Sequence, residues 1–401
     1  MFAHLPLTAH VPVFCFGCGR PIHPMPTSRV PTVSRPVAFL TAAIGSCVAG
    51  AVVIAALATA EEHEPPIELG SRRKLFVDRT LIDRLDGATL KLHEPVSAGT
   101  AIRIDKPWEG PANFGMSVIE LDGRLLMYYR GWSLVDPKDE SGVACVAESR
   151  DGGATWTKPV PMSYGDAPRE QFYTNNTQPY FRAPHVFVAP AARFMQGRQV
   201  LDEQRAEAVG LRPIGKHVYF KDCSDAVLLT TRAGSTAYDQ TFMETFIRPG
   251  LGDSNWVSRT NYPLTGILPA GKGQMQLFVS RNCMQPTWHI ERLLMRTDGF
   301  ASVSAPWAGG EMVTKPLTFT GGELEINYRT GAAGSVRIEI QDPDGAPLAG
   351  FAAADCPEII GDEIERVVAW EAGSDVEALA GKPVRLRFIL ADADLFSFRF
   401  R

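Results

Sequence analysis

The stretch Ser149-Arg-Asp-Gly-Gly-Ala-Thr-Trp156 decides the fold that this sequence predicts. Its pattern, Ser-x-Asp-x-Gly-x-Thr-Trp, is the Asp-box, a hairpin turn on the outer edge of a small β-sheet. The aspartate caps backbone N–H groups, glycine supplies a positive φ, and the tryptophan packs beneath the turn. A decayed copy, Thr231-Arg-Ala-Gly-Ser-Thr-Ala-Tyr238, has alanine where the aspartate should be.

Three similar blocks contain or follow these turns, at residues 108–156, 178–238 and 256–300. Each holds short runs rich in Val, Ile, Phe and Tyr, separated by Gly, Asp-Gly or Pro, which predicts strands. Antiparallel repeats of this length are typical of β-propeller blades, which bury their faces by stacking around an axis. The expected strands are 117–121, 125–129, 143–148, 185–189, 226–230, 276–280 and 290–295, and the best helical candidate is 202–209.

After Thr314 the strands lengthen and alternate apolar with polar residues, with turns at 342–345 and 381–383. This period-2 pattern favours a β-sandwich. Asp392-Ala-Asp394 supplies half of a calcium site, and a solvated turn is the favoured interpretation. The expected strands are 324–328, 336–340, 367–370, 384–390 and 395–400.

The composition is that of a globular protein: 401 residues, 45% hydrophobic, with 40 basic and 45 acidic side chains and a net charge of −5. These values exclude a disordered chain and a multi-span membrane protein. A mildly acidic body without a basic stripe argues against nucleic acid as a partner.

Residues 37–60 carry no charge; Arg29 and Arg35 precede them and Glu61 follows. A positive flank, an apolar run and a final Ala-Thr-Ala60 predict a signal peptide cut after Ala60. The run is also long enough for an uncleaved membrane anchor. Either way we expect an exported protein, secreted, periplasmic or anchored, that meets the membrane only through this segment.

The predicted organisation is therefore all-β: an extension and leader at 1–60, a shortened β-propeller at 67–310, and a jelly-roll-like β-sandwich at 311–401. The exported cysteines, Cys145, Cys223, Cys283 and Cys356, lie in or beside apolar runs and are expected to be buried single thiols. We expect no cofactor and propose no metal site, because dinucleotide, phosphate-loop and zinc-protease motifs are missing from the sequence and the histidines are dispersed.

Five motifs resemble those of exported bacterial glycoside-hydrolase-like five-bladed propeller proteins, related to the N-terminal domains of glycoside hydrolase families 32 and 43. The resemblance covers residues 67–401 and implies the fold more than the reaction. The motifs are Lys74-Leu-Phe-Val-Asp78, Pro107-Trp-Glu-Gly110, Tyr173-Thr-Asn-Asn-Thr-Gln-Pro-Tyr-Phe-Arg-Ala-Pro-His185, Phe246-Ile-Arg-Pro-Gly250 and Gly309-Gly-Glu-Met-Val-Thr-Lys-Pro316.

The chain departs from that family twice. Only sixteen residues separate Trp156 from Tyr173, where relatives carry one or two further blades, so the ring is expected to be incomplete or to close unusually. Arg182-Ala-Pro-His185 stands where family 43 has its acidic residue, and an arginine cannot act as the general acid.

In a propeller the loops that lead into the innermost strands gather at the axis, so we take the site candidates from them. Hydrolysis of a glycosidic bond needs two carboxylates, one of them a general acid. The catalytic candidates are Glu109, Asp78 and Glu170. The sugar-binding candidates are Trp108, Asn113, Arg182, His185, Trp256, Arg259 and Asn261.

Each candidate also has a structural interpretation: Glu109 as a surface residue, Arg182 as an ion pair between blades, and His185 and the tryptophans as packing. Three functions remain open: a hydrolase acting on a glycan, a non-catalytic protein whose Arg182, Arg259 and Asn261 hold an acidic or polar sugar, or a structural surface protein. The expected partner of the first two is an oligo- or polysaccharide.

Overall fold

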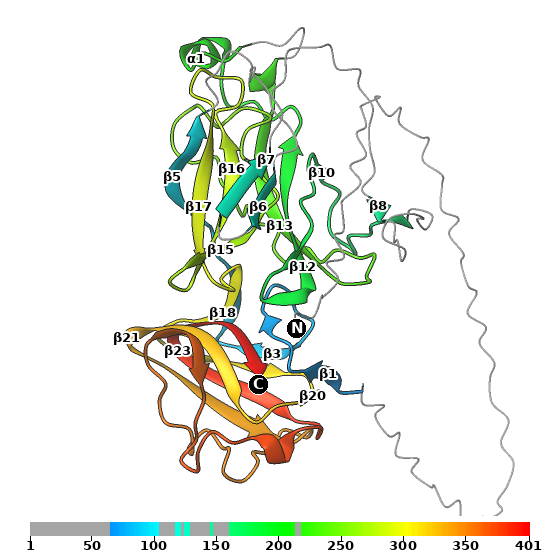
Figure 1. Cartoon of the computed structure of the whole chain (residues 1–401), viewed down its shortest axis with the longest axis vertical. Coiled ribbons are helices and arrows are strands. Elements are labelled where there is room, and N and C mark those ends of the chain that lie inside the picture. The colour runs from blue at the N-terminus through cyan, green and yellow to red at the C-terminus, as the bar shows by residue number, and fades with distance from the viewer. Residues whose placement is uncertain (1–64, 104–116, 122–123, 129–144, 147–159, 213–217) are drawn as a thin grey trace, which may run out of the picture.

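The computed structural model describes residues 65–103, 117–121, 124–128, 145–146, 160–212 and 218–401. These residues are mostly in strands (Figure 1), which confirms the all-β class. In these ranges no helix is long and apolar enough to cross a membrane. The predicted leader, the loop at 108–114 and the Asp-box lie outside them.

Helices are few in the described ranges: α1 (Glu203–Ala208) and the 3-10 turns η1 (Tyr219–Lys221) and η2 (Glu377–Leu379). Helix α1 forms where 202–209 predicted one, and Asp202 caps it by accepting a hydrogen bond from the N–H of Arg205 at 2.8 Å. The side chain of an N-terminal aspartate satisfies one of the donors that a helix leaves open.

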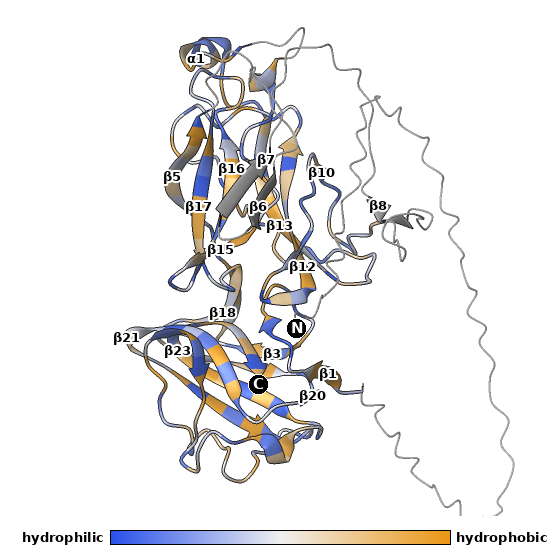
Figure 2. Ribbon diagram, in the orientation of Figure 1, coloured by the Kyte–Doolittle hydropathy of each residue, from blue (hydrophilic) through white to orange (hydrophobic). Residues whose placement is uncertain are grey.

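The C-terminal half forms an eight-stranded sheet around one hydrophobic core. Its two longest strands, β21 (Leu324–Gln341) and β23 (Arg385–Phe400), each cover two of the expected strands. They stay paired through a bulge between Thr330 and Ser335, so no turn separates their halves. Hydrophobic and hydrophilic bands alternate along both (Figure 2), as the period-2 pattern predicts. The neighbouring strands from this half are β18 (Ala301–Ala305), β19 (Gly310–Thr314) and β22 (Asp362–Val367).

Three strands of this sheet come from the start of the described chain: β2 (Lys74–Leu75), β3 (Ile82–Asp86) and β4 (Thr89–Leu92). In addition, β1 (Ile67–Gly70) pairs in parallel with β20 (Leu317–Phe319). The expected domain boundary at residue 310 placed all four in the propeller. The structure differs because Leu69, Phe76 and Ile82 belong to the C-terminal hydrophobic core.

A second, four-stranded antiparallel sheet contains β10 (Gln171–Phe172), β11 (Gln178–Tyr180), β12 (Ala183–Met195) and β13 (Cys223–Arg232). Two isolated bridges, Ala226 with Ile247 and Thr230 with Asp239, add the segment 239–247 along the free edge of β13. The sheet therefore has four positions from edge to edge.

The third sheet contains β14 (Tyr262–Pro263), β15 (Leu268–Gly271), β16 (Gln274–Arg281), β17 (His289–Arg296) and β5 (Val96–Arg103). Strands β14 and β15 both pair with β16, so this sheet also has four positions. Its last strand, β5, comes from the N-terminal side of the chain.

The second and third sheets share a core in which Val188 and Leu228 of one meet Leu277 and Leu293 of the other. Two short ladders, β6 (Ser117–Leu121) with β7 (Arg124–Tyr128) and β8 (Cys145–Val146) with β9 (Val160–Pro161), belong to the first block. A closed propeller is not established by these sheets. The described cysteines Cys223, Cys283 and Cys356 are buried and free.

Candidate functional site

The structure separates the predicted site residues into two groups at opposite ends of β12. This strand pairs with β13 from Val186 opposite Arg232 to Met195 opposite Cys223. Nine residues of extended chain span roughly 30 Å. We call the Arg232 end, which faces the C-terminal sheet (Figure 1), the junction end, and the Cys223 end the far end.

Asp78, Arg182 and His185 lie at the junction end. Asp78 follows β2, is 5% exposed, and accepts hydrogen bonds from the guanidinium of Arg232 and, at 3.0 Å, from the N–H of Thr80. The carboxylate is therefore already engaged within the chain. His185 lies beside Arg232, because the N–H of Ala233 donates to the His185 carbonyl at 3.1 Å.

Positive charge gathers around Asp78. The junction cluster consists of Arg72, Lys74, Asp78, His185 and Arg232, so three cations face one carboxylate. Burial, and then the charges of Arg72 and Arg232, lower the pKa of Lys74 to about 8, against the opposing effect of Asp78. Burial is the main cause of this shift, and the two arginines add to it more than Asp78 offsets.

The imidazole of His185 is held neutral by the same surroundings. Burial, then the charges of Lys74, Arg72 and Arg232, lower its pKa to about 4. Its Nε2 atom is buried and has no hydrogen-bond partner among the described residues. A buried polar atom without a partner is costly and commonly marks a place for a ligand or water.

Arg182 is committed to the contact between the sheets. Its Nη2 lies 2.7 Å from Glu365 of β22, and its Nε lies 3.6 Å from the buried carboxylate of Asp298. This agrees with the structural interpretation of an ion pair, although the pair joins the turn between β11 and β12 to the C-terminal sheet rather than two blades. Arg182 has less freedom to bind a sugar than the sequence predicts.

Glu170 lies toward the far end, where it accepts from Arg193 of β12 at 2.7 Å and from Gln240. Arg193 is seven residues along β12 from the partner of Arg232, so Glu170 and Asp78 are roughly 20 Å apart. Two carboxylates must be about 5 to 10 Å apart to act on one glycosidic bond. Asp78 and Glu170 are therefore too far apart to act together, and the predicted role of either acid beside Glu109 stays a prediction.

Trp256, Arg259 and Asn261 lie at the far end. Asn261 is fully buried and donates to the carbonyls of Ser224 and Asn255, at 2.7 and 2.9 Å, so its amide holds a loop rather than a ligand. The indole N–H of Trp256 donates to the Gly250 carbonyl at 3.1 Å.

Arg259 has an aromatic environment. Its guanidinium lies 4.9 Å from the ring centre of Tyr219 and 6.0 Å from that of Tyr173, which is 46% exposed. Four of the seven non-glycine residues with positive φ in the described part belong to the two loops at this end: Arg259, Asn261, Asn282 and Met284. Such strain needs support from the surrounding structure.

Trp108, Glu109 and Asn113 lie outside the described residues. In the part that the structure describes, no three His, Cys, Asp or Glu side chains are grouped to hold a metal ion.

Sequence reasoning missed Arg72, Lys74 and Arg232. Lys74 and Asp78 are the first and last residues of the motif Lys74-Leu-Phe-Val-Asp78, and this motif was the sequence signal that could have identified the cluster.

No family model and no curated protein sequence matches this chain. Among solved structures it is similar to a glycoside hydrolase family 43 arabinoxylan arabinofuranohydrolase from Bacillus subtilis, in complex with cellotetraose. The identity is 9% and the TM-score 0.19, and the match covers 71% of this chain but 53%, about half, of the enzyme. A likeness at this score carries no argument about this protein.

Proposed function

We propose that this chain is an exported, propeller-like protein that binds an acidic carbohydrate at the junction cluster without cleaving it. The observation that carries the proposal is the excess of positive charge there: Arg72, Lys74 and Arg232 surround a single carboxylate, Asp78, which Arg232 already engages. The carboxylate of a uronic acid would supply the missing charge.

The propeller-like arrangement rests on the two sheets with four positions that share a core. Strand β5 supports it, because it brings the N-terminal side of the chain onto the outer edge of the last of these sheets. Strands from the N-terminal and C-terminal sides of the propeller segment therefore pair in one sheet. This pairing holds the two sides together, which a ring with too few blades needs. The carbohydrate class rests on the motif resemblance to glycosidase-like propellers.

Binding without cleavage is favoured over hydrolysis by the described acids. Asp78 and Glu170 each bind an arginine, and the length of β12 between them prevents joint action on one bond. The remaining catalytic candidate is Glu109. The cluster lies between β2 of the C-terminal sheet and β12 and β13, and such boundaries are frequent ligand sites.

Calorimetric titration of the full chain with tetragalacturonate tests the proposal. We expect the acid to bind and its methyl ester, which has the same ring but no charge, to bind at least roughly tenfold more weakly, since hydrogen bonds to charged groups contribute about 1.5 to 3 kcal/mol. Lys74→Met, which keeps the length of the side chain, should weaken acid binding similarly.

The matched control is Lys382→Met, because Lys382 is an exposed lysine far along the chain in a turn of the C-terminal half. It should bind like the unaltered chain. Equal affinity for acid and ester, or unchanged binding by Lys74→Met, would refute the junction site. Recovery of shortened galacturonate after incubation would instead refute the non-catalytic assignment.

Export is proposed from residues 37–60 and has its own test. Fractionation of cells that express the full chain should recover it outside the cytoplasm. Deletion of residues 37–60 should retain it inside, and N-terminal sequencing of the exported form separates cleavage after Ala60 from an uncleaved anchor.

A further inference from the structure

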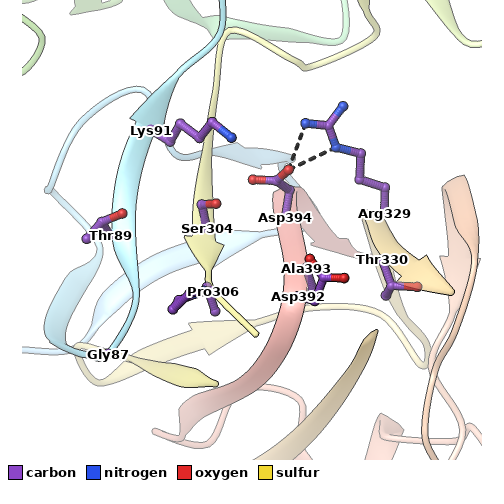
Figure 3. Close-up of a pocket in the computed structure, with 12 residues that line it drawn as sticks. Gly87, Thr89, Lys91, Ser304, Pro306, Arg329, Thr330, Asp392, Ala393 and Asp394 are labelled. Atoms are coloured by element: carbon purple, nitrogen blue, oxygen red, sulfur yellow. Dashed lines mark hydrogen bonds and ion pairs between the residues drawn. The ribbon is translucent and has the colours of Figure 1, made fainter. Parts of the chain in front are cut away.

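A depression of about 550 Å³ opens on the C-terminal sheet, and its lining includes none of the residues of the junction cluster (Figure 3). Strands β4, β18 and β23 and the bulge of β21 form its walls. The polar side chains on these walls are Thr89, Lys91, Ser304, Arg329, Thr330, Asp392 and Asp394. This volume lies within the range of small-molecule sites.

One wall is closed by an internal ion pair. Asp394 is 7% exposed and accepts from Ser302 at 2.8 Å and from the Nε of Arg329 at 2.9 Å. The expectation of a solvated turn at 392–394 is therefore wrong for Asp394. Because Arg329 and Asp394 neutralise each other, neither gives the depression a net charge.

Two further charges are uncommitted. Asp392 and Lys91 are exposed, and neither side chain forms an ion pair or hydrogen bond with another residue in the ranges that the structure describes. The depression thus offers a negatively charged hydrogen-bond acceptor, a positively charged hydrogen-bond donor and three hydroxyls. This mixture suits a ligand that both donates and accepts hydrogen bonds.

Asp392 has an unfavourable backbone conformation. Its φ is +42°, outside the region that most residues adopt. Gly331 and Gly334 make room for it: a Cβ atom on Gly331 would lie 1.8 Å from the Asp392 Oδ2, and one on Gly334 would lie 2.4 Å from the Asp392 carbonyl oxygen. The N–H of Asp392 donates to the Pro306 carbonyl at 3.0 Å, which holds this part of β23 against the end of β18.

The lining excludes several ligand classes. The lining charges balance, Lys91 and Arg329 against Asp392 and Asp394, so they give no net attraction for an anion, and two carboxylates are too few for a cation site of oxygen ligands. The walls hold no large apolar side chain for a hydrophobic ligand. Charge-assisted hydrogen bonds from Lys91 and to Asp392 suit vicinal hydroxyl groups.

We propose that this depression binds a neutral sugar, held between the Lys91 ammonium and the Asp392 carboxylate. The site is independent of the junction cluster, which takes an acidic ligand. An experiment can therefore refute either proposal without refuting the other.

The test is calorimetric titration of the full chain with neutral tetrasaccharides: xylotetraose, cellotetraose and mannotetraose. At least one should bind, and excess tetragalacturonate should leave that binding unchanged. Asp392→Gly deletes the carboxylate and relieves the positive φ, so the variant should fold, and its affinity should fall roughly tenfold. Lys91→Met should lower the affinity similarly.

The matched control is Asp344→Asn, an exposed aspartate in the turn at 342–345 of the same half, which should bind normally. Thermal unfolding of each variant confirms that the fold is retained. Absence of binding by all three neutral probes, or full affinity in Asp392→Gly, would overturn the proposal. Displacement of the neutral sugar by tetragalacturonate would also overturn it, because the two ligands would then share one site.

Discussion

The hydroxyl of Tyr180 donates to the carboxylate of Asp298 at 2.7 Å, and the same hydroxyl accepts from the Asp298 N–H at 2.9 Å. Tyr180 ends β11, whereas Asp298 lies in the turn between β17 and β18. Both side chains are buried. This reciprocal pair fastens the second sheet to the point where the chain passes from the third sheet into the C-terminal sheet.

Asp298 also anchors the C-terminal sheet, because its other oxygen accepts from Ser397 at 2.7 Å and from Asn327 at 3.1 Å. Two arginines balance its charge: Arg73 at 3.7 Å and Arg182 at 3.6 Å. A fully buried carboxylate with this many partners is expected to be a main determinant of how the sheets are held together.

Asp298→Asn should therefore destabilise the protein strongly. Asparagine tolerates the positive φ of 63° at this position, so the substitution removes the charge and one acceptor oxygen without straining the backbone. Loss of one partner from a buried ion pair costs about 3 to 5 kcal/mol. Urea unfolding measures the change in the free energy of unfolding, and a loss below about 1 kcal/mol would show that Asp298 carries no such role.

Glu365→Gln should have little effect, although Glu365 binds the same Arg182 at the shorter distance of 2.7 Å. The side chain of Glu365 is 54% exposed, and ion pairs in contact with water contribute about 0.2 to 1 kcal/mol. The same unfolding experiment compares the two carboxylates directly. A loss from Glu365→Gln equal to that from Asp298→Asn would show that burial does not set the difference.

Local patterns predicted the strands of this protein well. The run at 117–121 is β6, and the alternation after Thr314 produces β21 and β23. What the patterns could not supply is the pairing of distant segments. Leu69 and Phe76 join a core formed by residues more than 200 positions away, and nothing in their local sequence identifies that partner.

The site was harder to predict for a related reason. His185 and Asn261 were grouped because each lies near the start of a block, but β12 and β13 place them at opposite ends of the sheet. Lys74 and Arg232 resemble ordinary solvated charges at strand ends, and only the fold places them around Asp78. Charge convergence of this kind depends on tertiary contacts rather than on spacing.

Gly310→Ala tests the union of the N-terminal strands with the C-terminal sheet. A Cβ atom on Gly310 would lie 2.4 Å from the carbonyl carbon of Gly87 and 2.5 Å from the Ala88 nitrogen. Because the obstacle is backbone, relief requires β19 to separate from this N-terminal segment, and we expect a loss of about 1 to 3 kcal/mol.

Gly322→Ala is its control. The nearest atom to a Cβ there is the Glu377 Cβ at 3.7 Å, an ordinary contact, so stability should be unchanged or slightly raised. Urea unfolding of both variants gives the comparison. Equal stability of the two would mean that residues 87–88 do not press against β19.

Acid should lower the stability of the fold through two half-buried histidines at a higher pH than it does through the carboxylates. Burial lowers the pKa of His93 to about 4, with Arg329, Lys91 and Arg296 adding to burial and Asp394 opposing it; His185 is lowered to the same value. Both titrate near 6.5 in the unfolded chain. Between pH 4 and 6.5 the unfolded state therefore binds more protons, and the free energy of unfolding must rise with pH across that window.

Each histidine contributes at most about 1.4 kcal/mol per pH unit to this slope. Carboxylates whose pKa is held low, such as those of Glu325 and Asp394, add their own dependence only below about pH 4.5. Urea unfolding at pH 5, 6, 7 and 8 should show stability that falls from 6 to 5. A smaller fall from 8 to 7 is expected from Lys74, whose pKa is lowered to about 8. His93→Gln and His185→Gln should each reduce the fall from 6 to 5, and an undiminished fall there in both variants would assign it to other groups.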